Sequence, residues 1–458
     1  MAITVVSSTI TQELADFCAR LRFDRLPAEV VERTKDLLLD HLGVCWRGMQ
    51  ADSSAAVLRA ARALADGGRS TVVGQAERLS PAWAALVNGT AAHAIEMDDV
   101  ASKSSLHPGV PVFPAALALA EELDASAEAL LVAVIAAYEV VMRVGNALNP
   151  ASAYKRGFHP TGVAGAFGAT AAAASLLGLD AERFANALGI AGTMASGSIE
   201  YLSGGAWTKR LNAGWAAHCG VVAARLATEG FTGPATAIEG PLGLLHAYSD
   251  EPNANEAIAG LVESYQVMRV SIKPYACCRY NHGPIDCMLQ LRRSVSDLDA
   301  IEDIRLGVLS GGYLLVADPI DQKRQPHNVV DAQFSAPFAA AVALVHGQAG
   351  LPQYTQATVD DSRIRSLMAR VTCYTDPELD AVYPDQWPAA ASIRLRSGAV
   401  LEAHQPYPLG EPENPLSTEA LTAKFRQMVD VPWADEAIER IRALPAGSVP
   451  GVLALFRA

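Results

Sequence analysis

Apolar residues recur at three- and four-residue intervals through most of the first 265 residues, the spacing that places them on one face of an α-helix. The pattern is clear after Pro27, a residue type that favours the first turn of a helix, where apolar and charged positions intermix over 30–42. Pairs of glycine and proline residues separate the periodic stretches. The pattern predicts further helices over residues 11–21, 51–64, 81–95, 114–123, 127–144, 162–177, 181–195 and 211–229.

The pattern changes after Glu263, where apolar and polar positions begin to alternate as they do in β-strands. Strands are predicted over residues 266–273, 301–308 and 368–374, and a hairpin over 392–403 with Ser397-Gly398 as its turn. The helical period also returns, at residues 281–294, 332–345, 417–428 and 435–444. The middle of the chain therefore mixes strands with helices, and its last 50 or so residues are helical again.

Length and composition support two domains. At 458 residues the chain is too long for one typical core, and it is 50% apolar but only 6% aromatic. Ala, Leu and Val make up most of the apolar residues, which favours closely packed helices. We predict a mainly α fold in which residues 266–405 form a smaller α+β domain, and the helical residues 406–458 could rejoin residues 1–265 in a large all-helical domain, with the α+β domain as an insertion.

Charge and cysteine content exclude several classes of partner. The formal net charge of −13 would repel nucleic acid and anionic membrane surfaces, so we expect neither as a partner. The longest apolar run, residues 129–142, contains Glu139 and is shorter than the roughly 20 residues that span a membrane. The N-terminus does not look like a signal peptide, and seven scattered cysteines argue against a disulfide framework. We therefore expect a cytoplasmic protein.

The first polar cluster runs from His93 to Asp99 and is followed by His107-Pro-Gly. Helical spacing would place His93 and Glu96 on one face, with Glu96, Asp98 and Asp99 crowded at the end of the helix. Crowded carboxylates raise one another's pKa, which is one way to tune a general base. The alternative is an ordinary solvated helix terminus.

Two further clusters lie at predicted helix starts. His159, in a Gly-Phe-His-Pro-Thr-Gly segment, precedes a helix of very small residues, whose free N–H groups attract anions; the alternative is a histidine that caps a buried helix. Lys209 and Arg210 follow the glycine pair Gly204-Gly205 and begin another helix. Cations at this position oppose the helix dipole, and a bound carboxylate would relieve the conflict. The alternative is two solvated basic side chains.

A fourth cluster spans residues 273–282, at the boundary between the predicted domains. Lys273, Arg279 and His282 offer three donors there, and pockets favour such junctions. The adjacent cysteines 277 and 278 are weak candidates for a nucleophile, because no base is identified for them. The chain lacks HExxH, paired CxxC and EF-hand spacings, so no metal site is predicted. It also lacks the glycine motifs of nucleotide-binding folds and the GxSxG motif of hydrolases.

Five segments, in this order, resemble landmarks of the MmgE/PrpD family: NGTAAHAIEMDDV with HPGVPVFPAALALAE, GFHPTGVAGAFGA, GGAWTKRLNAG, KPYACCRYNHGPID and PLGEPENPLSTEALTAKF. The family includes 2-methylcitrate dehydratase, cis-aconitate decarboxylase and iminodisuccinate epimerase. The resemblance covers nearly the whole chain. It implies a large helical domain built from both chain ends, a smaller α+β domain, a homodimer, and no metal or organic cofactor.

The resemblance also implies roles for individual residues. It places His107, His159, Lys209 and Lys273 in the active-site cleft, and Tyr313 near a cleft tyrosine of the decarboxylases. Members of the family commonly carry Asp-Phe-Asp-Asp-Thr where this chain has residues 96–100. Glu96 therefore replaces an aspartate and Val100 a threonine, and this departure bears on the substrate.

The implied reactions share one step, in which a C–H or C–CO₂⁻ bond beside a carboxylate breaks. Lys209 and Lys273 would stabilise the developing charge, and one of the two histidines would move the proton. Asp98 or Asp99 would orient a histidine or serve as the second base, and the remaining substrate contacts would come from Glu96, Arg210, Arg279, His282 and Tyr313. The leading hypothesis is a hydro-lyase of the 2-methylcitrate dehydratase type. The alternatives are an epimerase of an imino-dicarboxylate, a cis-aconitate-type decarboxylase, and a non-catalytic dimer that binds polycarboxylates.

Overall fold

The computed structural model describes residues 8–203 and 205–457, and the chain forms two compact units. The larger unit comprises the residues up to Val270 together with those from Thr418 onward, and the smaller unit comprises Ser271–Ser417. The chain is mainly helical, with a helical unit built from both ends and an inserted unit of helices and strands, as the pattern predicts. None of the described helices is long and apolar enough to cross a membrane.

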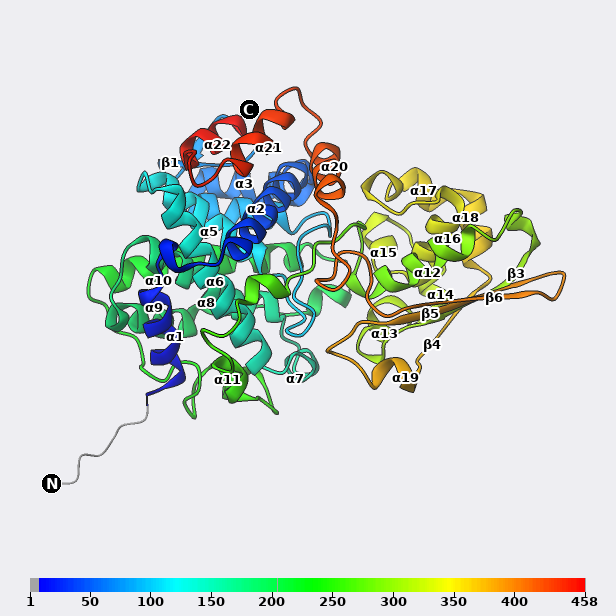
Figure 1. Cartoon of the computed structure of the whole chain (residues 1–458), viewed down its shortest axis with the longest axis horizontal. Coiled ribbons are helices and arrows are strands. Elements are labelled where there is room, and N and C mark those ends of the chain that lie inside the picture. The colour runs from blue at the N-terminus through cyan, green and yellow to red at the C-terminus, as the bar shows by residue number, and fades with distance from the viewer. Residues whose placement is uncertain (1–7, 204, 458) are drawn as a thin grey trace. The chain divides into compact units, whose positions relative to one another are not determined.

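The larger unit is a bundle of helices (Figure 1). Its helices are α1 (Ile10–Arg20), α2 (Ala28–Gly48), α3 (Asp52–Leu64), α4 (Pro81–Ala92), α5 (Gly109–Glu122), α6 (Ala127–Ala147), α7 (Pro150–Lys155), α8 (Pro160–Leu176), α9 (Ala181–Met194), α10 (Thr208–Thr228), α11 (Leu244–Tyr248), α20 (Thr418–Met428), α21 (Ala434–Arg442) and α22 (Val449–Leu455). The unit also contains a two-stranded antiparallel sheet of β1 (Gly67–Thr71) and β2 (Arg78–Leu79), so it is not strictly all-helical.

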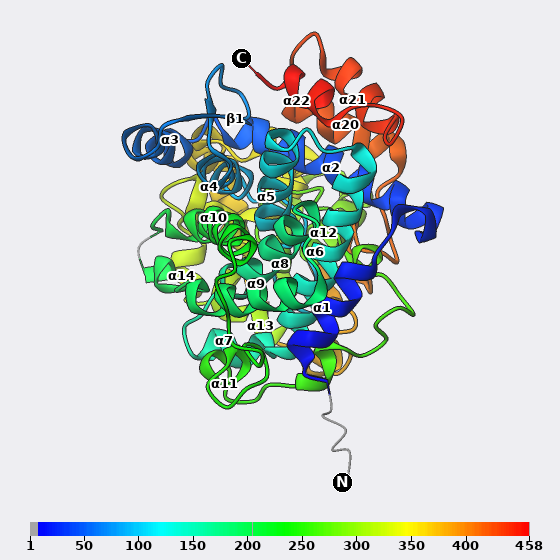
Figure 2. The ribbon, with the colours of Figure 1, turned by 90° about the vertical axis from the view of Figure 1, so that its left-hand side faces the viewer.

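Helix α8 lies at the centre of this unit, packed against α5, α6, α9 and α10 (Figure 2). Every side chain of its first 15 residues is buried, because Ala and Gly let neighbouring helices approach closely. At Gly168 an added Cβ atom would lie 2.6 Å from Cβ of Val141 on α6, so this helix pair requires glycine there. The rigid start of α8 carries His159.

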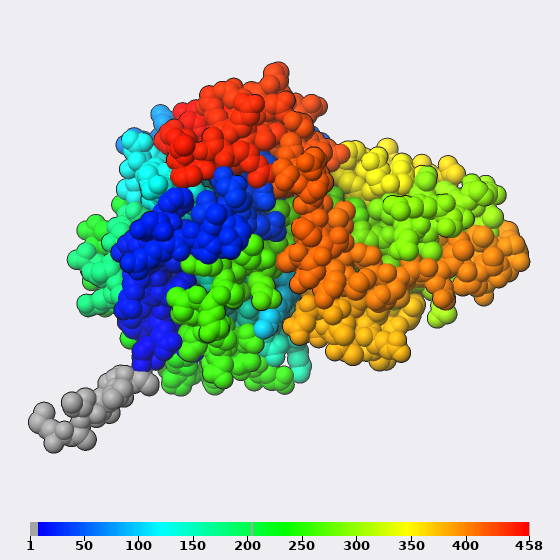
Figure 3. Space-filling model, in the orientation of Figure 1, coloured from blue at the N-terminus to red at the C-terminus, as the bar shows by residue number. Residues whose placement is uncertain are grey.

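The C-terminal segment completes the larger unit by packing on its N-terminal helices. Helix α20 lies against α2, and Lys424 Nζ is 2.6 Å from the buried Asp40 Oδ1. Figure 3 shows the same arrangement on the surface, where the red C-terminal residues lie directly against the blue N-terminal ones. Lys424 also donates a hydrogen bond to the carbonyl of Met97 at 2.8 Å, which anchors the polar segment after α4.

The smaller unit is a four-stranded sheet with helices. The sheet has the order β4-β3-β5-β6, with β3 and β4 parallel and the other pairs antiparallel. Helices α12 and α16 lie on one face of it (Figure 1). The elements are α12 (His282–Arg292), β3 (Ile301–Gly307), α13 (Ser310–Val316), α14 (Ile320–Lys323), α15 (Val329–Gln333), α16 (Ala336–His346), α17 (Gln356–Asp360), α18 (Ser362–Met368), β4 (Val371–Tyr374), α19 (Pro377–Asp380), β5 (Ala389–Leu395) and β6 (Val400–Gln405).

Three of the predicted strand segments are confirmed and one is wrong. The strands near 301 and 371 form, and β5 and β6 make the hairpin that turns at Gly398, whose φ is +86°. The segment 266–273 is not a strand, because Gln266–Arg269 forms a 3₁₀ helix. Its backbone groups pair with side chains instead: Gln266 N donates to Glu139 on α6, and the carbonyl of Val270 accepts from Arg33 on α2.

Candidate active site

The polar segment between α4 and α5 is folded back into the larger unit. Helix α4 ends at Ala92, and Glu96 has a φ of +57°, so His93 and Glu96 do not share a helix face and that prediction is wrong. Glu96, Asp98 and Asp99 are all buried. The alternative of a solvated helix terminus is therefore also wrong, and three acidic side chains lie within the protein interior.

Asp98 links two histidines. Its Oδ2 atom lies 2.8 Å from Nδ1 of His93 and 2.8 Å from Nδ1 of His107. The two rings meet edge to face with their centroids 4.8 Å apart. The backbone N–H of His107 donates to Thr161 Oγ1 at 3.1 Å, which ties this segment to the first turn of α8. The sequence placed Asp98 and His107 in the site, but it did not assign His93.

His159 lies beside this pair, at the residue that precedes α8. Its ring stacks on that of His93, with centroids 5.9 Å apart and an interplanar angle of 17°. Asn212, on the first turns of α10, places Nδ2 3.3 Å from His159 Nδ1 and 3.2 Å from the carbonyl of Ser198. Burial, and then the neighbouring His93 and Lys209, hold the pKa of His159 well below its usual value.

These contacts give His107 and His159 opposite tautomers. His107 Nδ1 lies 2.9 Å from the carbonyl of Asp99, and a carbonyl only accepts hydrogen bonds, so Nδ1 carries the proton and Nε2 the lone pair. The carbonyl of Ser198 likewise identifies the atom between it and His159 as the amide nitrogen of Asn212. That nitrogen donates to Nδ1 of His159, so the proton of neutral His159 lies on Nε2.

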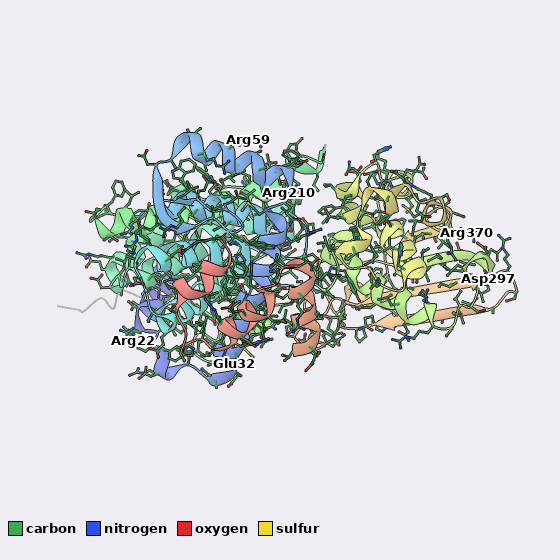
Figure 4. All side chains as sticks on the ribbon, turned by 90° about the horizontal axis from the view of Figure 1, so that it is seen from above. Arg22, Glu32, Arg59, Arg210, Asp297 and Arg370 are labelled. Carbon is green, nitrogen blue, oxygen red and sulfur yellow. The ribbon has the colours of Figure 1, made fainter. Side chains whose placement is uncertain are left out.

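Lys209 forms an ion pair with Glu96, and both side chains are largely buried, at 12% and 6% exposed. The carboxylate expected beside this lysine at the start of α10 is therefore supplied within the chain, and the alternative of a solvated Lys209 is wrong. Arg210 instead donates to Ser53 Oγ on α3 at 2.9 Å. Burial lowers its pKa, and Figure 4 shows its side chain beside α3, near the labelled Arg59.

The buried carboxylate of Asp99 accepts hydrogen bonds from two groups of the protein. Its Oδ1 accepts from the backbone N–H of Gly109 at 2.9 Å, and its Oδ2 from the hydroxyl of Tyr138 at 2.6 Å. Burial raises the pKa of Asp99 to about 7, and the charge of Asp98 adds less than burial does. The sequence predicted a raised pKa here from crowding, whereas the main cause is desolvation. Tyr138 lies within the apolar run of α6 and was not predicted to contact the site.

Gly109→Ala is expected to destabilise the fold by about 1–3 kcal/mol, because an added Cβ would lie 2.7 Å from Asp99 Oδ1 and 2.9 Å from the Tyr138 hydroxyl. The measurement is the free energy of unfolding in denaturant. Gly67→Ala is the control, since nothing lies within 4 Å of its Cβ position. Equal effects at both glycines would contradict this packing.

Asp99→Asn is expected to cost more stability at pH 5 than at pH 8. The folded-state pKa of Asp99, about 7, lies above the ordinary 3.8, so its contribution is fully present below pH 4 and is lost as the pH rises through 7. Between pH 5 and the folded-state pKa this is about two pKa units, or about 3 kcal/mol at most. Tm of wild type and variant at both pH values measures the difference. Asp66→Asn, in an exposed loop, should show the same Tm difference at both.

The other predicted site residues belong to the smaller unit. Lys273 and His282 are buried there, and His282 Nε2 lies 3.4 Å from the carbonyl of Cys277. Arg279 is buried in an ion pair with Glu411, and its guanidinium carbon lies 5.9 Å from the centre of the Trp387 ring. The hydroxyl of Tyr313, on the half-buried helix α13, lies 3.3 Å from the carbonyl of Cys373.

Three acidic and imidazole side chains of the larger unit lie close enough together to be candidate metal ligands. Ligand atoms of His93, Asp98 and His107 lie within 4.8 Å of one another. Both imidazole nitrogens, however, lie 2.8 Å from the same carboxylate oxygen, which is the geometry of two N–H donors that share one acceptor. The three residues therefore fit a hydrogen-bonded histidine pair better than a metal site.

Comparisons with known proteins identify the family of this chain. The profile of the MmgE/PrpD N-terminal domain matches residues 12–257, and that of the MmgE/PrpD C-terminal domain matches residues 275–444. A cis-aconitate decarboxylase-like protein of Aspergillus oryzae is 28% identical over 96% of this chain and 95% of its own length. The human cis-aconitate decarboxylase is 28% identical over 91% of this chain and 87% of its own. A mitochondrial 2-methylcitrate dehydratase of Yarrowia lipolytica is 29% identical over 27% of this chain and 25% of its own.

Proposed function

The chain belongs to the MmgE/PrpD family, and from this premise we propose that it removes a proton next to a carboxylate of a small polycarboxylate without a cofactor, most simply as a hydro-lyase of the 2-methylcitrate dehydratase type. The observation that carries the proposal is the pair of histidines in opposite tautomers. His107 offers a lone pair at Nε2, and His159 a proton at Nε2. A base for the carbon-bound proton and a hydrogen-bond donor for the leaving hydroxyl, each already in the protonation state it needs, are what dehydration requires.

In this mechanism His107 takes the proton from the carbon beside the substrate carboxylate. Asp98 stabilises the imidazolium that forms, through its contact with Nδ1. His159 donates a hydrogen bond from Nε2 to the leaving hydroxyl, which departs as water with the proton that His107 removed, and its low pKa keeps the ring neutral with that N–H in place. The ammonium of Lys209, positioned by Glu96 in a largely buried site, stabilises negative charge on the carboxylate in the transition state. Lys273, Arg279, His282 and Tyr313 are proposed as further substrate contacts.

A second candidate is decarboxylation of a cis-aconitate-type acid. It is favoured by the relatives that cover 91–96% of this chain, which are described as cis-aconitate decarboxylases or decarboxylase-like. Loss of CO₂ requires a proton to be delivered to carbon but none to be removed. The His107 base would then be unnecessary, and this is why the tautomers favour dehydration.

The test is an NMR screen in D₂O of citrate, 2-methylcitrate, cis-aconitate and iminodisuccinate. New vinylic signals with loss of water support the hydro-lyase. Release of CO₂ from cis-aconitate would replace it with the decarboxylase. Deuterium incorporation without loss of water or CO₂ would indicate an epimerase. Binding without turnover of any acid would contradict catalysis and indicate a polycarboxylate-binding protein.

We also propose a homodimer formed through one face of α10. Trp207, Leu211, Trp215 and Leu226 lie at helical spacings and are each 36–48% exposed, an unusual apolar stripe for a soluble surface. A second copy of this chain would cover it. Leu211→Asp is expected to shift the protein from dimer to monomer in analytical ultracentrifugation, whereas Leu64→Asp, at an exposed leucine on α3, should leave the mass unchanged. A monomeric wild type would contradict this proposal.

We also propose that the protein is located in the cytoplasm. Cell fractionation would test this location, and recovery of the protein outside the cytoplasmic fraction would contradict it.

A further inference from the structure

His93 is the fully buried member of the histidine cluster, and the proposed mechanism gives it no step. It is 0% exposed, and its Nδ1 donates to Asp98 Oδ2, the atom that also contacts His107 Nδ1. Its ring contacts those of both histidines in the proposed mechanism, with centroids 4.8 Å from His107 and 5.9 Å from His159. Among the described residues its Nε2 has no hydrogen-bond partner, so the contact with Asp98 fixes its tautomer.

We propose that His93 is a positioning residue, which shares the Asp98 carboxylate with His107 and so limits how strongly His107 holds a proton. This inference rests on the proposed function, in which His107 is the base. His93, which does not itself react, would then keep His107 unprotonated and able to act as a base at neutral pH.

The physical argument concerns one carboxylate oxygen with two N–H donors. A carboxylate stabilises an adjacent imidazolium, and each additional donor to the same oxygen disperses its negative charge. With His93 in place, Asp98 orients His107 but raises its proton affinity less than an undivided carboxylate would. A base that held its proton too tightly would stay protonated at neutral pH and could not begin the reaction.

Other groups around the cluster also act on His107, and the test must keep them constant. The charged and titratable neighbours are Asp40, His41, Glu96, Asp99, His159 and Lys209. Of these, His41 offers a matched control. It is a buried histidine that stacks on Phe113 with centroids 4.9 Å apart, and its pKa is lowered to about 3, so removing it changes no charge near neutrality.

The experiment is a pH titration of the histidine Cε1–H signals by NMR in the full chain, with His107 assigned through His107→Gln. His93→Phe keeps a flat ring against His159 but removes the donor to Asp98. We expect it to raise the pKa of His107 by about 0.5–1 unit. His93→Asn, which retains an N–H donor near the position of Nδ1, should keep the wild-type value, and so should His41→Phe.

An unchanged His107 pKa in His93→Phe, or an equal rise in all three variants, would overturn the proposal. A measurement on the wild-type protein tests the proposal even if a variant does not fold. The ¹⁵N chemical shifts of His93 should show that its proton lies on Nδ1. A proton on Nε2 would also overturn the proposal. The acidic limb of the pH profile of kcat/KM should move upward with the NMR pKa. If no polycarboxylate turns over, the proposed function fails, yet the titration still tests the sharing of Asp98.

Discussion

His107→Gln is expected to lower kcat/KM for the polycarboxylate substrate by about 1000-fold, within the range that general acid–base groups contribute. Glutamine is close to histidine in size and keeps an amide near the position of Nε2, but it cannot accept a proton at neutral pH. Because binding groups remain, the loss should fall mainly on kcat and leave KM within about threefold. The acidic limb of the pH profile should disappear, since the group that titrates on that limb is gone.

Steady-state kinetics from pH 5 to 9 would measure both effects. His246→Gln, at an exposed histidine on α11, is the control and should retain wild-type rates. Activity of His107→Gln within tenfold of wild type would contradict its role as base and would move the assignment to His159. A loss of activity accompanied by a lower Tm would instead indicate that the ring contacts with Asp98 and with the carbonyl of Asp99 hold the fold together.

The order of elements was predictable because the apolar period is long and repeated. Helices such as α2 and α6 carry that period over many turns, and the hairpin at Gly398 carries a signal in its turn residues. The strand predicted over 266–273 does not form, because the alternation of apolar and polar residues does not show which groups the backbone will bond to. Glu139, more than a hundred residues earlier, takes the N–H of Gln266 that a neighbouring strand would need.

The candidate site was predictable where a short segment places a charged residue in an electrostatically unfavourable position. Lys209 stands at a helix start that disfavours cations, and the sequence therefore indicates that an anion lies nearby. It does not reveal that the anion is Glu96, 113 residues away. Tyr138 gave no signal, because an aromatic residue in an apolar helix is usually part of the core. His93 was visible in its motif, but its role depends on a turn at Glu96 that breaks the helical spacing.

Lys209→Met is expected to lower kcat/KM by about 100- to 1000-fold, the usual loss when a preorganised charge beside a developing anion is removed. The same change leaves the Glu96 carboxylate buried without its main cation, which should destabilise the fold by about 3–5 kcal/mol. The lost activity of Lys209→Met alone could therefore come either from the missing charge in the transition state or from a less stable fold.

The double variant Lys209→Met/Glu96→Gln separates the two effects. Glutamine removes the buried charge, so Tm should return towards the wild-type value, because neutral groups of similar shape replace an ion pair at little cost. Activity should remain at least 100-fold below wild type, since the stabilising charge is still absent. Glu96→Gln alone should keep the Lys209 charge and retain more activity than the double variant. If the double variant regained activity along with stability, Lys209 would be a structural partner of Glu96 rather than a group that stabilises the transition state.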